Sequence, residues 1–180
     1  EKGKPVHVLD IASGHGRYVL DALAAEALPE SVRLRDYSPI NVAAGQALIA
    51  ERGLQKVATF DEVNAYERAN YQNLNPRPTL GIVSGLHELF PDNDLILQSL
   101  YGFGDAIEPG GYLIYTGQPW HPQLEMIARC LSSHREGQDW VMRRRSQQEM
   151  DQLVEKAGFE KVHQWIDDDG IFTVSLAVKK

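Results

Sequence analysis

The hydrophobic pattern at the start of the chain predicts a buried strand, a tight turn and then a helix. Residues 6–11 (V-H-V-L-D-I) are mostly apolar and β-branched, as in a central strand covered on both faces. Small side chains dominate residues 12–16 (A-S-G-H-G), so backbone amides and a helix N-terminus can approach a ligand closely. Residues 17–28 then carry apolar side chains at helical spacing and stop before Pro29.

The alternation of strand and helix continues along the chain and predicts a parallel sheet. Further strands are expected at 31–35, 57–60, 80–86, 112–116, 161–166 and 172–178, and further helices at 38–53, 65–72, 91–107, 123–131 and 147–157. Asp167 to Gly170 is a turn signal that joins the last two strands into a hairpin. The fold class is therefore α/β: a doubly wound (Rossmann-like) three-layer sandwich with a seven-stranded sheet, mostly parallel, whose last strand is antiparallel.

The length, composition and charge of the chain exclude several classes of protein. The 180 residues suffice for one core, and no apolar run approaches the roughly 20 residues of a membrane span. The net charge of −7 argues against nucleic acid as a partner. A single cysteine, Cys130, excludes internal disulfides and favours a buried structural residue in a reducing compartment, so a cytoplasmic location is expected. Residues 70–79 (N-Y-Q-N-L-N-P-R-P-T) are typical of a surface loop.

The boundaries of the chain suggest a domain from a longer protein. Residue 1 is Glu, no signal peptide is visible, and the first strand begins about five residues in. We expect residues 1–180 to form one domain, with a further domain upstream in the same natural chain.

The small-residue turn predicts a nucleotide-type crevice and limits which nucleotide it holds. A dinucleotide fingerprint needs G-x-G-x-x-G, but Val19 stands where the third glycine is required. This departure argues against a nicotinamide oxidoreductase. Asp36 ends the second strand, where a carboxylate can accept both ribose hydroxyls of a nucleoside. The alternative for Asp36 is a loop acid or a secondary cap.

Five segments in the right order resemble class I S-adenosylmethionine-dependent methyltransferases over nearly the whole chain. They are D-I-A-S-G-H-G from Asp10, with Ala12 replacing the first glycine of the motif, D-Y-S-P-I-N-V from Asp36, Asn64-Ala65, P-G-G-Y-L-I-Y-T from Pro109, and R-S-Q-Q-E-M-D-Q-L-V-E-K-A-G-F from Arg145. In detail the chain resembles bacterial methyltransferase domains that are often attached behind an α/β-hydrolase domain. The resemblance implies S-adenosylmethionine as cofactor.

The resemblance also assigns cofactor contacts. Tyr37 would cover the adenine, Asn64 would accept a hydrogen bond from its amine, and Ser84 with Gly85 would lie beside the methionine part. Asn64 can equally cap the helix expected at 65–72. The implied cofactor-binding residues are Asp10, Ala12, Ser13, Gly14, Gly16, Tyr18, Asp36, Tyr37, Asn64, Ala65, Ser84 and Gly85.

Candidate catalytic and substrate residues follow the fourth and fifth strands, because the carboxyl ends of parallel strands face the ligand. His87 and Glu88 either point toward the reaction space or start a solvated loop. His121 is a third candidate base. Gln118 and Trp120 suit a substrate wall, although Trp120 can instead pack its loop down.

The remaining sequence patterns concern charged residues and metal ligands. Arg143 to Arg145 is typical of a solvated segment, with an anion site for a substrate carboxylate or phosphate as the alternative. No spacing of ligands predicts a metal site.

The sequence therefore predicts an enzyme that moves the methyl group of S-adenosylmethionine to an unidentified small-molecule acceptor by in-line displacement. A general base is optional, because the sulfonium already activates the methyl group. The alternative is a non-catalytic, cofactor-binding regulatory or scaffolding domain. We also expect the upstream sequence to supply a lid over the substrate or a second domain.

Overall fold

The structure is a computed structural model that describes residues 5–25, 29–132 and 143–180. The strands are β1 (His7–Ile11), β2 (Ser31–Asp36), β3 (Ala58–Glu62), β4 (Leu80–Val83), β5 (Tyr112–Gly117), β6 (Phe159–Ile166) and β7 (Thr173–Lys179). The α-helices are α1 (Arg17–Ala25), α2 (Pro39–Glu51), α3 (Asn93–Ala106), α4 (Leu124–Cys130) and α5 (Gln147–Lys156), and two short 3₁₀ helices are η1 (Arg68–Tyr71) and η2 (His87–Leu89).

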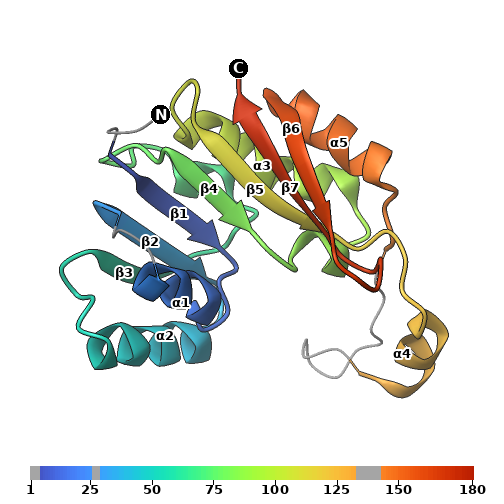
Figure 1. Ribbon diagram of the computed structural model, residues 1–180, viewed down its shortest axis with the longest axis horizontal. Helices are drawn as coiled ribbons and strands as arrows, with labels where there is room; N and C mark the ends of the chain where they lie inside the picture. Colours follow the sequence, from blue (N-terminus) through green and yellow to red (C-terminus); the bar gives the residue numbers. More distant parts are fainter. Residues whose placement is uncertain (1–4, 26–28, 133–142) are drawn as a thin grey trace.

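The strands form one twisted sheet in the order β3-β2-β1-β4-β5-β7-β6 (Figure 1). β7 lies between β5 and β6 and runs antiparallel to both, whereas the pairs from β3 to β5 are parallel. The α/β fold and the antiparallel last strand predicted from the sequence are confirmed. The order reverses on either side of β1, which places a crevice at the carboxyl ends of β1 and β4, as in other doubly wound sheets.

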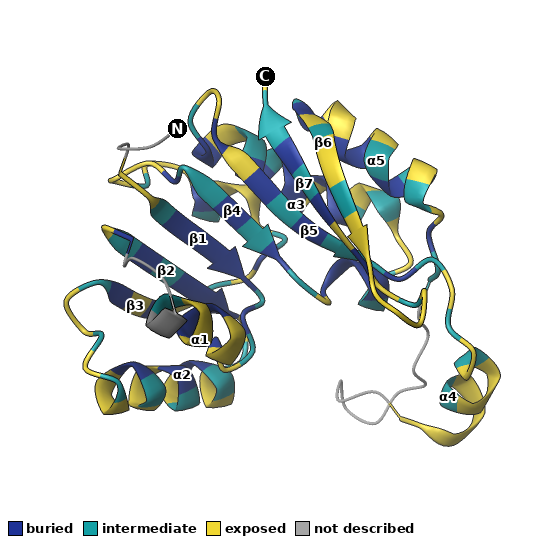
Figure 2. Ribbon diagram, in the orientation of Figure 1, coloured by how far each residue is buried: buried dark blue, intermediate teal, exposed yellow. Residues whose placement is uncertain are grey.

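Two apolar cores lie on opposite faces of the sheet. One packs α1 and α2 against β1, β2 and β3 around Leu20, Leu34 and Phe60. The other packs α3 and α5 against the opposite face of β1 and against β4 to β7, around Phe103, Leu113 and Phe159. Burial is deepest along β1 and β2, while most of β6 is exposed (Figure 2).

Several local expectations are wrong. β4 ends at Val83 rather than at residue 86, because residues 84–86 have no strand partner beyond the Val83–Tyr115 pair. The expected helix at 65–72 is the single 3₁₀ turn η1, whose Tyr71 is 1% exposed and donates a 2.7 Å hydrogen bond to the Ala65 carbonyl. The loop expected at 70–79 therefore begins inside η1, whose Tyr71 is buried.

Two single-residue expectations also fail. Cys130 is exposed at the end of α4, where no described residue of the helix is buried, so it is not a core residue. Ser38, followed by Pro39, is expected from the sequence to cap the second helix; it precedes α2 with extended backbone, but its side chain makes no capping hydrogen bond. Among the described residues, no helix is long and apolar enough to cross a membrane.

The contact between α2 and β3 gives a test of the first core. Gly45 lies so close to Phe60 that an added Cβ would stand 2.2 Å from the ring. Helix propensity alone would make Gly45→Ala stabilising by about 1 kcal/mol. We expect the opposite sign, a loss of about 1–3 kcal/mol in the free energy of unfolding, because the core is overpacked.

Urea denaturation measures this effect. Ala47→Gly, at an exposed position of the same helix, is the matched control and should cost about 1 kcal/mol through propensity alone. Phe60→Leu should recover part of the loss in the Gly45→Ala background. A Gly45→Ala variant more stable than the parent would contradict the packing.

Candidate active site

The turn between β1 and α1 has the backbone geometry that its small residues permit. Ala12, Gly14 and Gly16 all have positive φ, at 51°, 58° and 69°. An added Cβ at Gly14 would meet nothing within 4 Å, whereas at Gly16 it would stand 2.6 Å from the Leu34 side chain. Gly14 therefore borders open space where a ligand can approach, and Gly16 is required for packing of the turn against β2.

Ser13 fastens this turn to β2. Its hydroxyl donates to the Asp10 carbonyl at 3.1 Å and accepts from the Arg35 amide at 3.2 Å, and its own amide donates to the Arg35 carbonyl at 3.0 Å. The Ser13 side chain is buried. Its described contacts thus position the turn.

Asp36 joins the turns that follow β1 and β2. Its Oδ2 accepts from the Gly14 amide at 2.9 Å, and its Oδ1 accepts from the Ser38 amide at 2.9 Å and from Asn41 Nδ2 at 3.0 Å. The neighbouring Tyr37 side chain is 70% exposed. The Asp36 carboxylate therefore borders Gly14, and the exposed Tyr37 is the next residue of the chain.

Asp10 is a buried acid at the end of β1. It is 0% exposed, and the Tyr18 hydroxyl donates to its Oδ1 at 2.5 Å. Its Oδ2 has no hydrogen-bond partner among the described residues. Burial raises the pKa of Asp10 from 3.8 to about 7, and the negative charge of Asp36 adds to that rise. The Tyr18 pKa is also raised, by burial and by the Asp10 charge.

Asn64 and Ala65 form a turn after β3. Asn64 Oδ1 accepts from the Tyr66 amide at 3.0 Å, and its Nδ2 donates to Glu67 at 3.2 Å. Ala65 is buried in the core. Asn64 thus stabilises its own turn, as in the capping alternative, although the helix is only η1; adenine binding stays a prediction.

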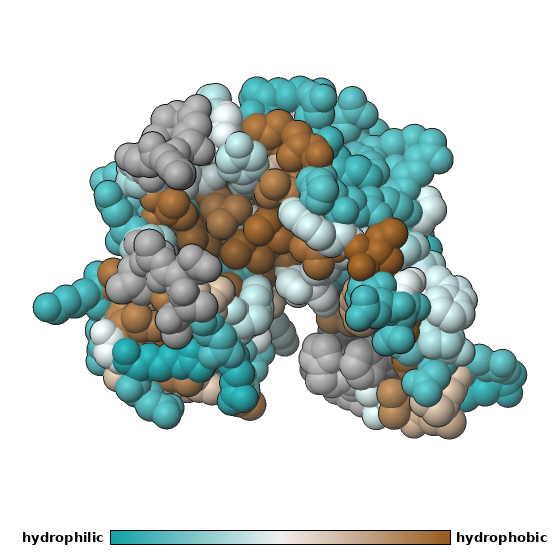
Figure 3. All heavy atoms as spheres, viewed as in Figure 1, coloured by the Kyte–Doolittle hydropathy of each residue, from teal (hydrophilic) through white to brown (hydrophobic). Residues whose placement is uncertain are grey.

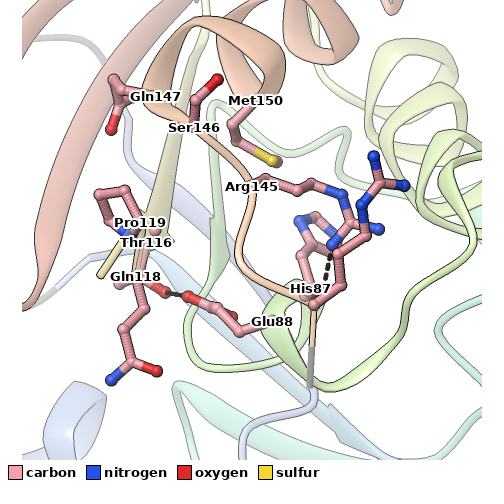
Figure 4. Close-up of a pocket in the computed structure, with 11 residues that line it drawn as sticks. His87, Glu88, Thr116, Gln118, Pro119, Arg145, Ser146, Gln147 and Met150 are labelled. Atoms are coloured by element: carbon pink, nitrogen blue, oxygen red, sulfur yellow. Dashed lines mark hydrogen bonds between the residues drawn. The ribbon is translucent and has the colours of Figure 1, made fainter. Parts of the chain in front are cut away.

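A hydrogen-bonded chain links the ends of β4 and β5. Gly85, with φ of 70° and open space at its Cβ position, donates its amide to Thr116 Oγ1 at 2.8 Å. The Thr116 hydroxyl donates in turn to Glu88 Oε1 at 3.1 Å (Figure 4). Sequence reasoning missed Thr116, although its place at the carboxyl end of β5 could have drawn attention to it.

Glu88 is enclosed between these strand ends. Its side chain is 7% exposed, and Oε2 has no hydrogen-bond partner among the described residues. Burial raises the pKa of Glu88, while the Thr116 hydrogen bond and the nearby Arg144 and Arg145 charges oppose the rise. A buried carboxyl oxygen of this kind is suited to receive a proton or a hydrogen bond from a ligand.

His87 is buried beside the pocket that Glu88 and Thr116 also line, so the solvated-loop alternative is wrong, and its place at the reaction space stays a prediction. It is 2% exposed, and its Nε2 lies 2.7 Å from the Ser99 hydroxyl of α3. Since that hydroxyl donates to the Ile96 carbonyl at 3.2 Å, the ring nitrogen is the donor. Burial and the Arg145 charge lower the pKa of His87 to about 3, so the imidazole is neutral.

The arginine run forms a clamp: Arg143 and Arg145 hydrogen-bond to the segment between β4 and α3. The prediction that this run is a solvated segment is wrong. Arg145 is buried and donates to the His87 carbonyl at 2.7 Å, the Phe90 carbonyl at 2.8 Å and Asn93 Oδ1 at 2.7 Å. Arg143 donates to the Pro91 carbonyl at 2.9 Å and pairs with Glu149. The clamp fixes η2 and the loop before α3 (Figure 4).

The loop after β5 carries the predicted substrate residues in different environments. Gln118 is buried and accepts a hydrogen bond from Arg144. Trp120 is 56% exposed, so it does not pack its loop down. His121 is half-buried, and its Nδ1 accepts from the Gln123 amide at 3.1 Å, which leaves Nε2 as the protonated nitrogen.

Comparison with known proteins identifies the family. Residues 1–179 match the sequence profile of a family described as "Putative methyltransferase". The chain belongs to this methyltransferase family. It is 60% identical over 179 residues to a protein of Escherichia coli (strain K12) called "Uncharacterized protein YnbC". The alignment covers 99% of this chain and 31% of that protein, so the chain spans about a third of its length.

Solved structures share the methyltransferase fold. An O-methyltransferase family protein from Burkholderia thailandensis superposes with a TM-score of 0.77 and 17% identity, over 98% of this chain and 52% of that one. A SAM-dependent methyltransferase from Methanosarcina mazei superposes with a TM-score of 0.73 and 20% identity, over 97% of this chain and 92% of that one. At these identities the likeness establishes the fold.

The Asp10 environment predicts a pH dependence of stability. An acid whose pKa is raised on folding retains its proton in the folded state after the unfolded state has lost it. The Asp10 contribution therefore decreases the free energy of unfolding as pH rises from about 4 to about 7, by up to about 1.4 kcal/mol per pH unit, and is constant above. Asp10→Asn should remove this decrease.

Chemical denaturation of parent and variant between pH 4 and pH 8 measures the difference. The lowered His87 pKa acts in the opposite direction, since its stabilisation is lost as pH falls below about 6.5, and it cancels in the comparison. Tyr18→Phe is the matched control: without the hydroxyl, the Asp10 pKa should rise further and the decrease should extend to higher pH. Parallel profiles for parent and Asp10→Asn would exclude the raised pKa.

Proposed function

We propose that the chain transfers the methyl group of S-adenosylmethionine to an unidentified small-molecule acceptor by in-line displacement. The observation that carries the proposal is the open space at Gly14 between the Asp36 carboxylate and the buried Asp10. Membership of a methyltransferase family and the description of one structural neighbour as SAM-dependent support it.

The nucleoside half of the cofactor fits the edge near β2. The two ribose hydroxyls need an acceptor, and the Asp36 carboxylate has lone pairs beyond the bonds it makes to the Gly14 and Ser38 amides. The exposed ring of Tyr37 would cover the adenine, and Asn64 with Ala65 would border its far side. These assignments keep the roles expected from the sequence.

The amino-acid half fits the edge between β1 and β4. Asp10 Oδ2 has no hydrogen-bond partner in the part of the chain that the structure describes, and burial of its carboxyl raises the pKa of Asp10. The ammonium group of the cofactor would supply both a donor and a positive charge. Gly85, with open space in front of its backbone, would let the methionine part approach beside Ser84.

Bound S-adenosylmethionine supplies a methyl group that its sulfonium already activates. The task of the protein is then to align the acceptor behind that methyl group and to exclude water. Glu88 is our first choice as base for an acceptor hydroxyl, whose proton would pass to Oε2. His121 is the second choice, and it would have to give up the hydrogen bond from the Gln123 amide before its Nδ1 could take a proton. His87, enclosed against Ser99, would act by positioning η2.

The acceptor side would be bordered by the loop after β5. Gln118 would orient a polar group through its amide, and Trp120 would present its exposed ring to the body of the acceptor.

We also propose that residues 1–180 act as one domain of a longer cytoplasmic protein, as the partial coverage of the E. coli relative suggests.

One observation favours the non-catalytic alternative: His87 and Glu88 are both buried. Calorimetric titration with S-adenosylmethionine, S-adenosylhomocysteine and NADH separates cofactor binding from an oxidoreductase. Transfer of a labelled methyl group to a panel of hydroxyl, amine and carboxylate compounds then separates an enzyme from a binding domain. Binding of NADH alone would refute the proposal, and cofactor binding without transfer to any compound would favour the alternative.

The ribose assignment predicts the effect of Asp36→Ala. Loss of the carboxylate should lower the affinity for S-adenosylhomocysteine by about 1–3 kcal/mol, because two ribose hydroxyls lose a charged acceptor. Glu62→Ala is the matched control, since Glu62 is the register partner of Asp36 on β3 and lies at the same sheet edge. Calorimetry measures affinity, and thermal unfolding checks that the Asp36→Ala variant is folded. Equal affinities of the folded variant and the parent would remove Asp36 from the site.

The base assignment predicts a separation of binding from turnover. Glu88→Gln should leave the cofactor affinity within about twofold and lower the rate of methyl transfer to a hydroxyl acceptor by about 10²–10⁴-fold. His121→Gln is the comparison variant and should change the rate less. Single-turnover transfer with the best acceptor of the panel provides the measurement. Unchanged transfer by Glu88→Gln would show that no proton passes to Glu88.

A further inference from the structure

One face of the sheet carries apolar side chains over β5, β7 and the end of β6, and none of the described helices packs on it there. Strand register places a contiguous set of side chains there: Ile82 pairs with Ile114, Ile114 with Leu176, and Tyr112 with Val178. Trp165 pairs with Val174 at the edge. We call this set the uncovered face; its members are Tyr112, Ile114, Trp165, Val174, Leu176 and Val178, and Leu80 and Ile82 border it where the first core ends.

The alternation of side chains along each strand establishes that these residues share a face. Their sequence neighbours Leu113, Tyr115 and Ala177 are fully buried against α3 and α5 on the opposite side. On the side of the uncovered face, α1 and α2 pack over β1, β2 and β3 and reach only as far as Leu80 and Ile82 (Figure 1). No helix among residues 5–25, 29–132 and 143–180 packs on the remaining strands of this side.

The exposure is large for apolar side chains in a sheet. Tyr112, Trp165 and Val174 are 42%, 51% and 37% exposed, and the other members are half-buried. A mostly parallel sheet is normally covered on both faces, and contiguous exposed apolar patches mark interaction surfaces. The space-filling view shows hydrophobic side chains gathered across the centre of this side of the molecule (Figure 3).

We propose that the uncovered face is the docking surface for the remaining polypeptide of the longer proteins of this family. The E. coli relative shares 60% identity over 99% of this chain, yet the chain accounts for only 31% of its length. Such a protein carries ample additional polypeptide joined to the same domain. The apolar side chains of β5 and β7 suit an apolar partner surface, such as one side of an amphipathic helix, whereas Glu160 and His163 on β6 would meet polar groups at its margin.

The topology makes this occupant geometrically accessible. β1 is parallel to β4 and β5, and β7 is antiparallel to them, so the start of β1 and the end of β7 lie at the same edge of the sheet. Polypeptide that leaves either end of the domain therefore starts at the rim of the uncovered face (Figure 1). The inference does not depend on the proposed cofactor or reaction.

Cysteine labelling tests the proposal. Val174→Cys would be introduced into this domain and, at the aligned position, into the full-length E. coli relative, and maleimide labelling of the peptide would be followed by mass spectrometry. Lys56→Cys, an exposed position after α2, is the matched control. We expect Val174→Cys to label at least roughly tenfold more slowly in the longer protein, and Lys56→Cys to label equally in both. Trp165→Cys serves as a second reporter if Val174→Cys does not fold.

Three results would overturn the proposal. Equal labelling of Val174→Cys in both proteins would mean that the face stays open. A concentration-dependent dimer of the isolated domain that protects Val174→Cys, detected by sedimentation, would assign the face to a second copy. Protection only in the presence of anionic phospholipid vesicles would assign it to a membrane surface.

Discussion

The carboxylate of Asp36 holds the two crevice turns at a fixed separation. The parallel register of β1 and β2 brings the turn after β1 beside the end of β2, and there Asp36 accepts the amides of Gly14 and Ser38. Charge-assisted hydrogen bonds to backbone amides are strong and directional. The open approach at Gly14 and the start of α2 therefore depend on one side chain, which the proposed function also requires as a ligand. The two carboxylate oxygens of Asp36 thus hold the turns together and, in the proposed function, also bind the ribose.

The strands of the fold could be predicted because each is an apolar run bounded by turn residues. The boundaries could not, because a strand ends where its neighbour stops pairing: Val83 is the last residue of β4 that pairs with β5, although residues 84–86 could continue an extended segment. The helix expected after β3 is replaced by η1, since Tyr71 enters the core and its hydroxyl bonds to the Ala65 carbonyl. Such a long-range packing choice leaves no periodic signal in the sequence.

Some features of the candidate site could be predicted from the sequence and others could not. Residues that act through backbone or at a strand end, such as Gly14 and Asp36, were accessible from spacing. The burial of His87 and Arg145 was not, because it depends on hydrogen bonds between segments 58 residues apart. A run of charged residues predicts a solvated segment when its hydrogen-bond partners are unknown. Arg145 is buried because carbonyl groups of η2 and of the following loop accept its hydrogen bonds. Thr116 is significant only once β4 and β5 are seen side by side.

The position of β7 has a consequence for synthesis of the protein. Of the seven strands that the structure describes, β7 is synthesised last, yet it lies inside the sheet between β5 and β6. Until it arrives, the outer edge of β5 is open and β6 has no neighbour, although all the helices have already been made. An open strand edge invites pairing with other chains, and long-range pairing is slow to form. The nascent domain is therefore most vulnerable to aggregation in the interval before β7 has been synthesised.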